Sequence, residues 1–216
     1  MESKLSPLQH EILQAFFMRQ KGFFLTGGSA LAGFHLGHRR TEDLDLFTRT
    51  WDLDEGDRSL RQTAREIGAE VEAIQTAPDF RRRLVRRGEE AVVVDLVLDR
   101  TPHGDEGPQE HAGIAVDPPG EILANKLCTL LSRAELRDLV DVLALERAGH
   151  HLEPALILAT RKDAGMTPAQ LAWTLSQIRI GDDAEIPGNY TVSELRAFLE
   201  SLQRRLIRMA FPGKHD

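Results

Sequence analysis

The chain has 216 residues, of which 41% are hydrophobic and 28% charged, and its formal net charge at pH 7 is −7. This composition is typical of a globular protein with one large or two small domains, and the acidic balance argues against general nucleic-acid binding. No apolar run approaches the roughly 20 residues of a membrane span, and "MESKLSPLQHEILQ" is not a secretory signal, so we expect a cytoplasmic protein without membrane association.

The first half of the sequence alternates between helical and strand patterns. A helix is predicted from Ser6 to about Gln20, because Ser6-Pro7-Leu8-Gln9 is a capping box with proline at the first helical position. A strand in "GFFLTGG", a short helix capped by Ser29 in "SALAGFHLG" and a strand in "EDLDLFT" follow. We then predict a helix over 57–68, a strand over 70–76, two strands in "FRRRLVRRGEEAVVVDLVLDR" that turn at Arg87-Gly88, and a loop in "TPHGDEGPQEHAG".

The second half of the sequence, after Pro118-Pro119, shows helical patterns alone, over about 119–132, 134–148, 152–163, 168–178 and 192–210. Thr167 and Thr191 each begin a further capping box. The single cysteine, Cys128, lies in an apolar helical pattern and is expected to be a small buried thiol. We therefore predict an α+β fold, with a mixed sheet and flanking helices over residues 1–116 and a helical domain over residues 117–216.

Three aspartates in predicted strands are the first candidates for chemistry. Asp43 and Asp45 point to the same side of their strand, because side chains alternate along it. Two like charges side by side favour a divalent cation between them, although a half-exposed strand with two surface aspartates is the alternative. Asp95 lies among valines in "AVVVDLVLD", where an unpaired carboxylate would cost several kcal/mol. It therefore belongs either to the same metal site or to a structural ion pair.

The segment Gly27-Gly28-Ser29 joins the first strand to a helix. Glycines let the backbone approach a ligand closely, and the N–H groups at a helix start attract phosphate, although an ordinary glycine turn gives the same pattern. Together with the three carboxylates, this turn predicts a site for a nucleoside triphosphate with two Mg²⁺ ions about 4 Å apart. In that scheme Asp43 and Asp45 bind both ions, and Asp95 binds the ion that activates the acceptor hydroxyl and could accept its proton.

These motifs resemble a known signature. Gly28-Ser29, Asp43-Leu44-Asp45 and a later strand aspartate, Asp95, resemble the DNA polymerase β-like nucleotidyltransferase superfamily. The stretch "LTGGSALAGFHLGHRRTEDLDLF" resembles in particular the AbiEii/AbiGii-type nucleotidyltransferase toxins of abortive-infection and toxin–antitoxin systems. "EILANKLCTLLSR" and "ELRDLVDVLAL" are similar to the later lysine and R-D-x-x-D motifs of that family, so the resemblance covers roughly residues 20–148. It implies a polymerase β-like core, Mg²⁺, an NTP substrate and a cognate antitoxin.

The later motifs lie in the helical half. Arg137, Asp138 and Asp141 share about 100° of a helical wheel, which either supports an Arg137–Asp141 pair worth a few tenths of a kcal/mol or presents a functional face. Lys126 lies at the margin of a leucine stripe, where it could snorkel to solvent, whereas the resemblance implies that it reaches the triphosphate as a point charge. The resulting candidate catalytic residues are Asp43, Asp45, Asp95 and Lys126, and the candidate NTP-binding residues are Gly27, Gly28, Ser29, Arg40, Lys126, Asp138 and Asp141.

Other charged segments allow two interpretations each. "RRRLVRR", from Arg81 to Arg87, is either the solvated face of an edge strand or a contact for a phosphate-bearing substrate. Arg39 and Arg40 precede the strand of Asp43 and either contact phosphate or base, or face solvent. The histidine pairs, His35 with His38 and His150 with His151, lack the accompanying Cys or Glu spacing of a zinc site.

The sequence thus predicts a Mg²⁺-dependent nucleotidyltransferase that moves a nucleoside monophosphate from an NTP to a hydroxyl and releases pyrophosphate. The resemblance implies a toxin that acts on RNA, such as a tRNA 3′ end, and is neutralised by an antitoxin. Two alternatives stay open, namely a protein hydroxyl as the acceptor and a non-catalytic nucleotide- or partner-binding module of the same fold.

Overall fold

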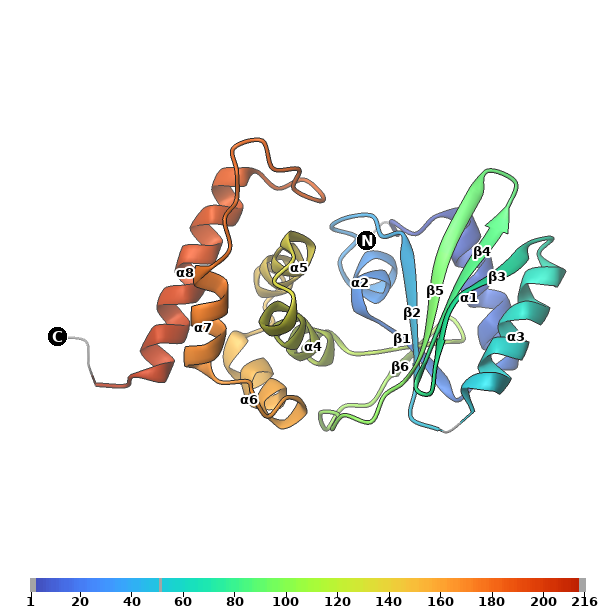
Figure 1. Cartoon of the computed structure of the whole chain (residues 1–216), viewed down its shortest axis with the longest axis horizontal. Helices are drawn as coiled ribbons and strands as arrows, with labels where there is room; N and C mark the ends of the chain where they lie inside the picture. Colours follow the sequence, from blue (N-terminus) through green and yellow to red (C-terminus); the bar gives the residue numbers. More distant parts are fainter. Residues whose placement is uncertain (1–2, 51, 214–216) are drawn as a thin grey trace. The chain divides into compact units, whose positions relative to one another are not determined.

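The computed structural model describes residues 3–50 and 52–213, and its elements fall into two compact units (Figure 1). One unit, the α/β unit, comprises Met1–Thr101 and Gly107–Pro118 and contains the strands of the described chain. The other, the helical unit, comprises Pro102–Glu106 and Pro119–Asp216. Within the described residues, no helix combines the length and the apolar character that a membrane crossing requires.

The α/β unit is built on a seven-stranded sheet with the order β3-β4-β5-β2-β1-β7-β6. Its strands are β1 (Phe23–Thr26), β2 (Asp43–Thr48), β3 (Glu70–Ala77), β4 (Phe80–Arg87), β5 (Glu90–Leu98), β6 (Gln109–His111) and β7 (Ile114–Val116). Strand β2 is parallel to β5 and antiparallel to β1, and β1 is parallel to β7. The sheet is therefore mixed, as predicted.

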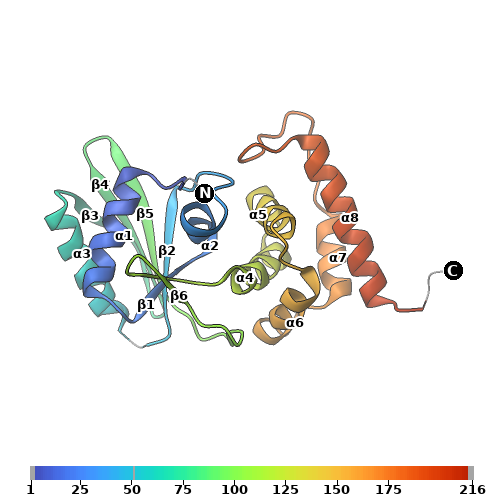
Figure 2. The same ribbon diagram turned by 180° about the vertical axis from the view of Figure 1, so that it is seen from behind.

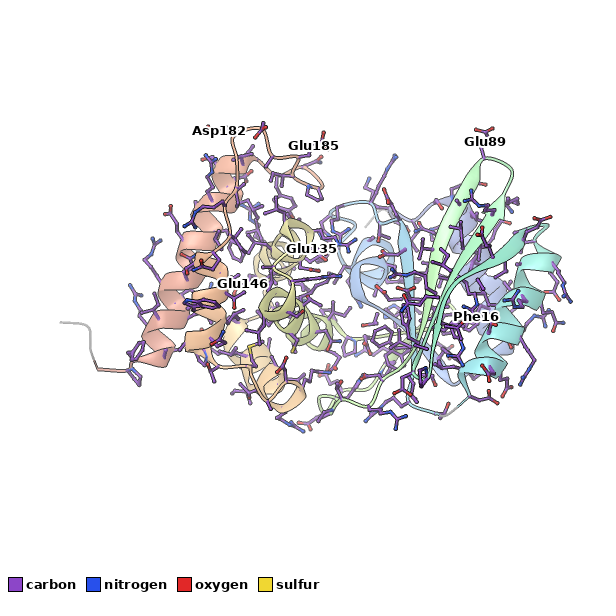
Figure 3. The ribbon with its side chains drawn as sticks, in the orientation of Figure 1. Phe16, Glu89, Glu135, Glu146, Asp182 and Glu185 are labelled. Atoms are coloured by element: carbon purple, nitrogen blue, oxygen red, sulfur yellow. The ribbon has the colours of Figure 1, made fainter. Side chains whose placement is uncertain are left out.

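Helices α1 (Pro7–Arg19) and α3 (Leu53–Glu66) cover one face of this sheet, and the short α2 (Gly27–Ala30) lies on the other side (Figures 1 and 2). Leu44 and Leu46 are fully buried in the core, whereas the carboxylate of Asp45 lies against Gly27 of α2. Phe16 of α1 is also fully buried there and meets the Phe23 ring edge-on, with the ring centroids 5.4 Å apart (Figure 3). The alternation of β2 consequently sends Asp43 and Asp45 to the face opposite α1 and α3.

The helical unit is organised around α4 (Pro119–Ser132), which packs on α5 (Leu136–Arg147), α6 (Leu152–Lys162) and α7 (Pro168–Ser176). Helix α8 (Val192–Ala210) packs on α5 and α7, and the carboxylate of Glu146 in α5 accepts hydrogen bonds from Arg205 in α8 (Figure 3). The segment Pro102–Glu106 belongs to this unit, and the N–H of Gly104 donates to Oε2 of buried Glu121 at 2.9 Å.

Local signals predict most of these elements. The five helices of the second half lie within two residues of the predicted bounds. The capping boxes of Ser6 and Thr191 are both formed, whereas at Thr167 the side chain accepts from the N–H of Gln170 without the reciprocal bond of a box. The helix expected from residue 57 begins earlier, at Leu53, because the side chain of Asp52 caps it by accepting from the N–H of Glu55. The short helix expected to be capped by Ser29 begins at Gly27, and Thr26 is its N-cap residue.

Two expectations for the sheet are wrong. The predicted loop "TPHGDEGPQEHAG" contains β6, a polar three-residue strand that pairs only with β7 and is exposed along most of its length. Such a short polar strand has no hydrophobic alternation to reveal it. The "RRRLVRR" segment lies in β4, which is not an edge strand, because β3 pairs along its outer side.

Candidate active site

The register of the sheet brings the three predicted carboxylates to one face. Asp45 in β2 lies directly beside Asp95 in the parallel strand β5, and Asp43 lies two residues from Asp45 on the same side. Paired residues on neighbouring strands point to the same face, so the three side chains share it. Asp43 and Asp45 are partly exposed and Asp95 is buried, which places Asp95 at the base of the group.

Asp95 is held by an arginine of the neighbouring strand. Arg82 in β4 lies opposite Asp95, and its Nε and Nη2 donate to Oδ1 at 2.9 Å and Oδ2 at 2.7 Å. The pKa of Arg82 is raised, first by this hydrogen bond and then by attraction to Asp95, Asp43 and Asp45. That influence indicates that all three carboxylates lie close to the guanidinium. The structural ion pair considered for Asp95 is thus present.

The donor atoms of this face fit a metal ion only in part. Carboxylate oxygens are the hard ligands that Mg²⁺ prefers, and Asp43 and Asp45 supply them on the open side of the sheet. The hydroxyl of Thr41 donates to Oδ1 of Asp43 at 2.7 Å and orients that carboxylate. Among the residues that the structure describes, however, no three His, Cys, Asp or Glu side chains form a metal-binding group. Both oxygens of Asp95 accept hydrogen bonds from Arg82.

The glycine turn is shaped to fit Asp45. Gly27 has a φ of +64°, a conformation that favours glycine, and a Cβ at this position would collide with Oδ2 of Asp45. Ser29 is fully buried, and its hydroxyl donates to the carbonyl of Thr26 at 3.2 Å and accepts from the N–H of Asp45 at 3.4 Å. The Ser29 hydroxyl therefore ties the turn to the strand of Asp45, and the Asp45 carboxylate lies against the backbone of Gly27.

The two neighbouring arginines differ from one another. Arg40 is exposed, whereas Arg39 is buried and its Nη1 donates to the carbonyl of Arg40 at 2.9 Å. A Cβ on Gly28 would lie 2.8 Å from Nη2 of Arg39, so the guanidinium packs against the glycine turn. Arg39 is thus placed beside the site by its packing. The sequence pattern alone did not predict that Arg39 is buried and Arg40 is exposed.

Arg82 was not among the predicted site residues, yet a signal for it exists. Strands β4 and β5 form a hairpin whose paired ends are Arg87 and Glu90, with Glu89 at its tip (Figure 3). Counting back from this turn places Arg82 opposite Asp95. Two other arginines of the strand have separate partners on α3, since Arg81 binds Asp54 and Arg83 binds Asp57.

The helical unit contains a second charged cluster. Nζ of Lys126 lies 2.8 Å from Oδ1 of Asp138 and 2.7 Å from Oδ2 of Asp141, and both carboxylates are completely buried. Nε of Arg133 donates to Oδ2 of Asp138 at 3.0 Å. Burial is the largest influence and acts to lower the pKa of Lys126, but attraction and hydrogen bonds from Asp141 and Asp138 together outweigh it, and the pKa is raised. Lys126 is therefore a buried cation and does not snorkel to solvent. Arg137, the third residue of the predicted polar face, donates from Nε to Glu135 at 2.6 Å.

Comparison with known proteins places this geometry in a family. The model of a family described as the nucleotidyl transferase AbiEii toxin of a type IV toxin–antitoxin system matches residues 12–211. No curated relative of the sequence was found. Among solved structures, JHP933 from Helicobacter pylori is 22% identical with a TM-score of 0.61, and the match covers 94% of this chain and 93% of that one.

A second solved structure is the MenT4 nucleotidyltransferase toxin of Mycobacterium tuberculosis. It is 16% identical with a TM-score of 0.66, and the match covers 93% of this chain and 82% of that one. At such identities, the two structures establish a common fold. The family model spans almost the whole chain, and the protein therefore belongs to the AbiEii nucleotidyltransferase toxin family and is a nucleotidyltransferase with a polymerase β-like core.

Proposed function

We propose that the protein transfers a nucleoside monophosphate from an NTP to a hydroxyl of RNA, such as a tRNA 3′ end, and that this reaction depends on Mg²⁺. The observation that carries the proposal is the pair Asp43 and Asp45 on the open face of the sheet, with the backbone of Gly27 directly against the Asp45 carboxylate. Oxygen ligands next to a side-chain-free turn are what a metal-bound triphosphate requires.

In this proposal the site residues of the α/β unit have separate roles. Asp43 and Asp45 would hold Mg²⁺, which when bound supplies positive charge to the triphosphate. Gly27 and Gly28 lack side chains, so the Asp45 carboxylate and the Arg39 guanidinium lie directly against the backbone of the turn, where they would meet a bound phosphate. The acceptor oxygen bonds to the α-phosphorus, the bond from that phosphorus to the bridging oxygen breaks, and pyrophosphate leaves. Asp95 is the candidate to accept the proton of the hydroxyl.

Lys126 has a structural role in the helical unit and a proposed role in NTP binding. Its charge is balanced by Asp138 and Asp141 in a buried cluster, which gives it a structural role in joining α4 to α5. The triphosphate contact that the family resemblance implies for Lys126, and the roles of Asp138, Asp141 and Arg40 in NTP binding, are part of the proposal. A conservative Lys126→Arg variant that folds normally but has a raised KM for the NTP would support this contact.

The acceptor is proposed to be RNA because the chain belongs to a family of toxins in toxin–antitoxin systems. The net charge of −7 favours a small RNA footprint, such as a single 3′ end, over extensive backbone contacts. The same family membership suggests a cognate antitoxin protein as a partner, and nucleotides and tRNA as reactants are consistent with action in the cytoplasm.

A transfer assay tests the proposal directly. The pure protein is incubated with each α-³²P-labelled NTP and total RNA, with Mg²⁺ or with EDTA. We expect label in the tRNA band only with Mg²⁺, loss of label in Asp45→Asn, and unchanged labelling in Asp105→Asn, which makes the same substitution at an exposed position. Label in a polypeptide alone would indicate a protein hydroxyl as the acceptor. NTP binding without any transfer would support a binding module.

A further inference from the structure

The guanidinium of Arg82 lies at the carboxylate of Asp95, which was the predicted third metal ligand. It donates to both oxygens of Asp95, and Asp43 and Asp45 also raise its pKa through their attraction. A divalent ion that approached Asp95 would meet a like charge and two occupied oxygens. The metal-binding capacity of this face is therefore set by Arg82 as well as by the acidic residues.

The bond between Arg82 and Asp95 is of a strong type. A planar guanidinium matches a carboxylate in a two-pronged arrangement, which is stronger and more directional than a single contact. The Asp95 side chain is only 7% exposed, so an ion has little access to it except past the guanidinium. Asp43 and Asp45 on β2 are only partly buried, so their side chains are more exposed than that of Asp95.

Arg82 also has the freedom to leave this position. Its side chain is 42% exposed, in contrast to Asp95, so it can exchange the carboxylate for water or for another anion. Its Cζ lies 5.5 Å from the ring centroid of Phe80 while the guanidinium is bound to Asp95, so the ring is a neighbour of the bound arginine. Arg82 is therefore an occupant that can be displaced, and it is not a buried structural cation like Lys126.

We propose that Arg82 competes with a divalent cation for Asp95, so that the nucleotide-free site binds one ion through Asp43 and Asp45. A second ion binds only when Arg82 has released Asp95. This inference rests on the proposed function only in taking these carboxylates as the metal site. Arg82 is thus a positioning residue that determines how many ions the site holds before substrate arrives.

Metal binding without catalysis tests this inference. The full chain, free of nucleotide, is titrated with Mn²⁺, and free Mn²⁺ is followed by electron paramagnetic resonance. We expect one ion in the wild type, which is lost in Asp45→Asn. In Arg82→Gln we expect a second ion, bound at least about tenfold more tightly than any second ion in the wild type, because a cation a few ångströms away has been removed. If Arg82→Gln does not fold, Arg82→Met removes the charge and keeps the packing on Phe80.

Two further variants make the result specific. Arg86→Gln removes a charge from an exposed position on the same face of β4, about 13 Å along the strand, and should reproduce the wild-type curve. Asp95→Asn added to Arg82→Gln should abolish the second ion. An Arg82→Gln curve identical to that of the wild type, or a second ion that survives Asp95→Asn, would overturn the inference. Absence of nucleotide transfer would sink only the proposed function, since the ion count does not depend on it.

Discussion

Gly27 and Gly88 allow backbone strain to be separated from the geometry of the site. Both adopt left-handed conformations, with φ of +64° and +59°. An added Cβ at Gly88 meets nothing within 4 Å, whereas at Gly27 it would lie 3.1 Å from Cγ of Asp45 and still closer to Oδ2. The substitutions Gly27→Ala and Gly88→Ala therefore carry the same intrinsic strain, about 1–2 kcal/mol, but only the first one displaces a predicted metal ligand.

The expected magnitude follows from the contact. To accommodate the methyl group, the Asp45 carboxylate must move by about 1 Å, and a displacement of that size costs roughly 100-fold in rate, or about 2.7 kcal/mol of transition-state stabilisation. We expect both variants to lose similar stability in urea unfolding. In the labelled-NTP assay, Gly88→Ala should retain wild-type kcat/KM, and Gly27→Ala should lose about 100-fold. Equal activity of the two variants would refute the placement of the reaction at this turn.

Three further predictions concern other parts of the chain. Lys126→Met should lower the free energy of unfolding by about 3–5 kcal/mol, because it removes the cation that two buried carboxylates share and leaves Asp138 with Arg133. A triple variant with Asp138→Asn and Asp141→Asn should recover most of this loss in urea titrations. Burial raises the pKa of Asp57, but hydrogen bonds and attraction from neighbouring arginines outweigh burial and lower it below 3.8. Its contribution to stability is therefore complete above the unfolded pKa and is lost as the pH falls through the folded value, so Asp57→Asn should flatten the acid limb of a stability–pH curve below about pH 4. Burial, with a smaller effect of a nearby carboxylate, raises the pKa of Cys128 to about 11, so its reaction with a disulfide reagent at pH 8 should be slow until urea unfolds the helical unit.

The arginines of β4 show how tertiary structure changes the meaning of a sequence pattern. Read along the chain, "RRRLVRR" is a basic island that could bind phosphate. In the fold, alternation sends Arg81 and Arg83 to α3 and Arg82 to Asp95, and Arg87 binds Glu11 of α1. Most of this positive charge is consequently used inside the α/β unit, which is consistent with an enzyme that contacts little RNA.

The candidate site was predictable where each step depended on neighbours in the sequence. The spacing of Asp43 and Asp45 determines that they share a face, and the Gly27 position follows from a turn between a strand and a helix. The adjacency of Asp45 and Asp95 was plausible but not derivable, because residues 49–89, with two other strands, lie between β2 and β5. The pairing of Arg82 with Asp95 depends on the register of the β4–β5 hairpin, which can be counted from the turn between Arg87 and Glu90.

The sequence by itself determined the local features of this protein, namely the capped helices, the alternation of β2 and the division between mixed and helical halves. These depend on backbone propensities and side-chain contacts within a few residues. Only the tertiary structure decided the strand order, the pairing of β6 with β7, the occupation of Asp95 by Arg82 and the burial of Lys126 between two aspartates. Those outcomes depend on which distant segments pack together, and the free energy of such packing comes from contacts that no single segment contains.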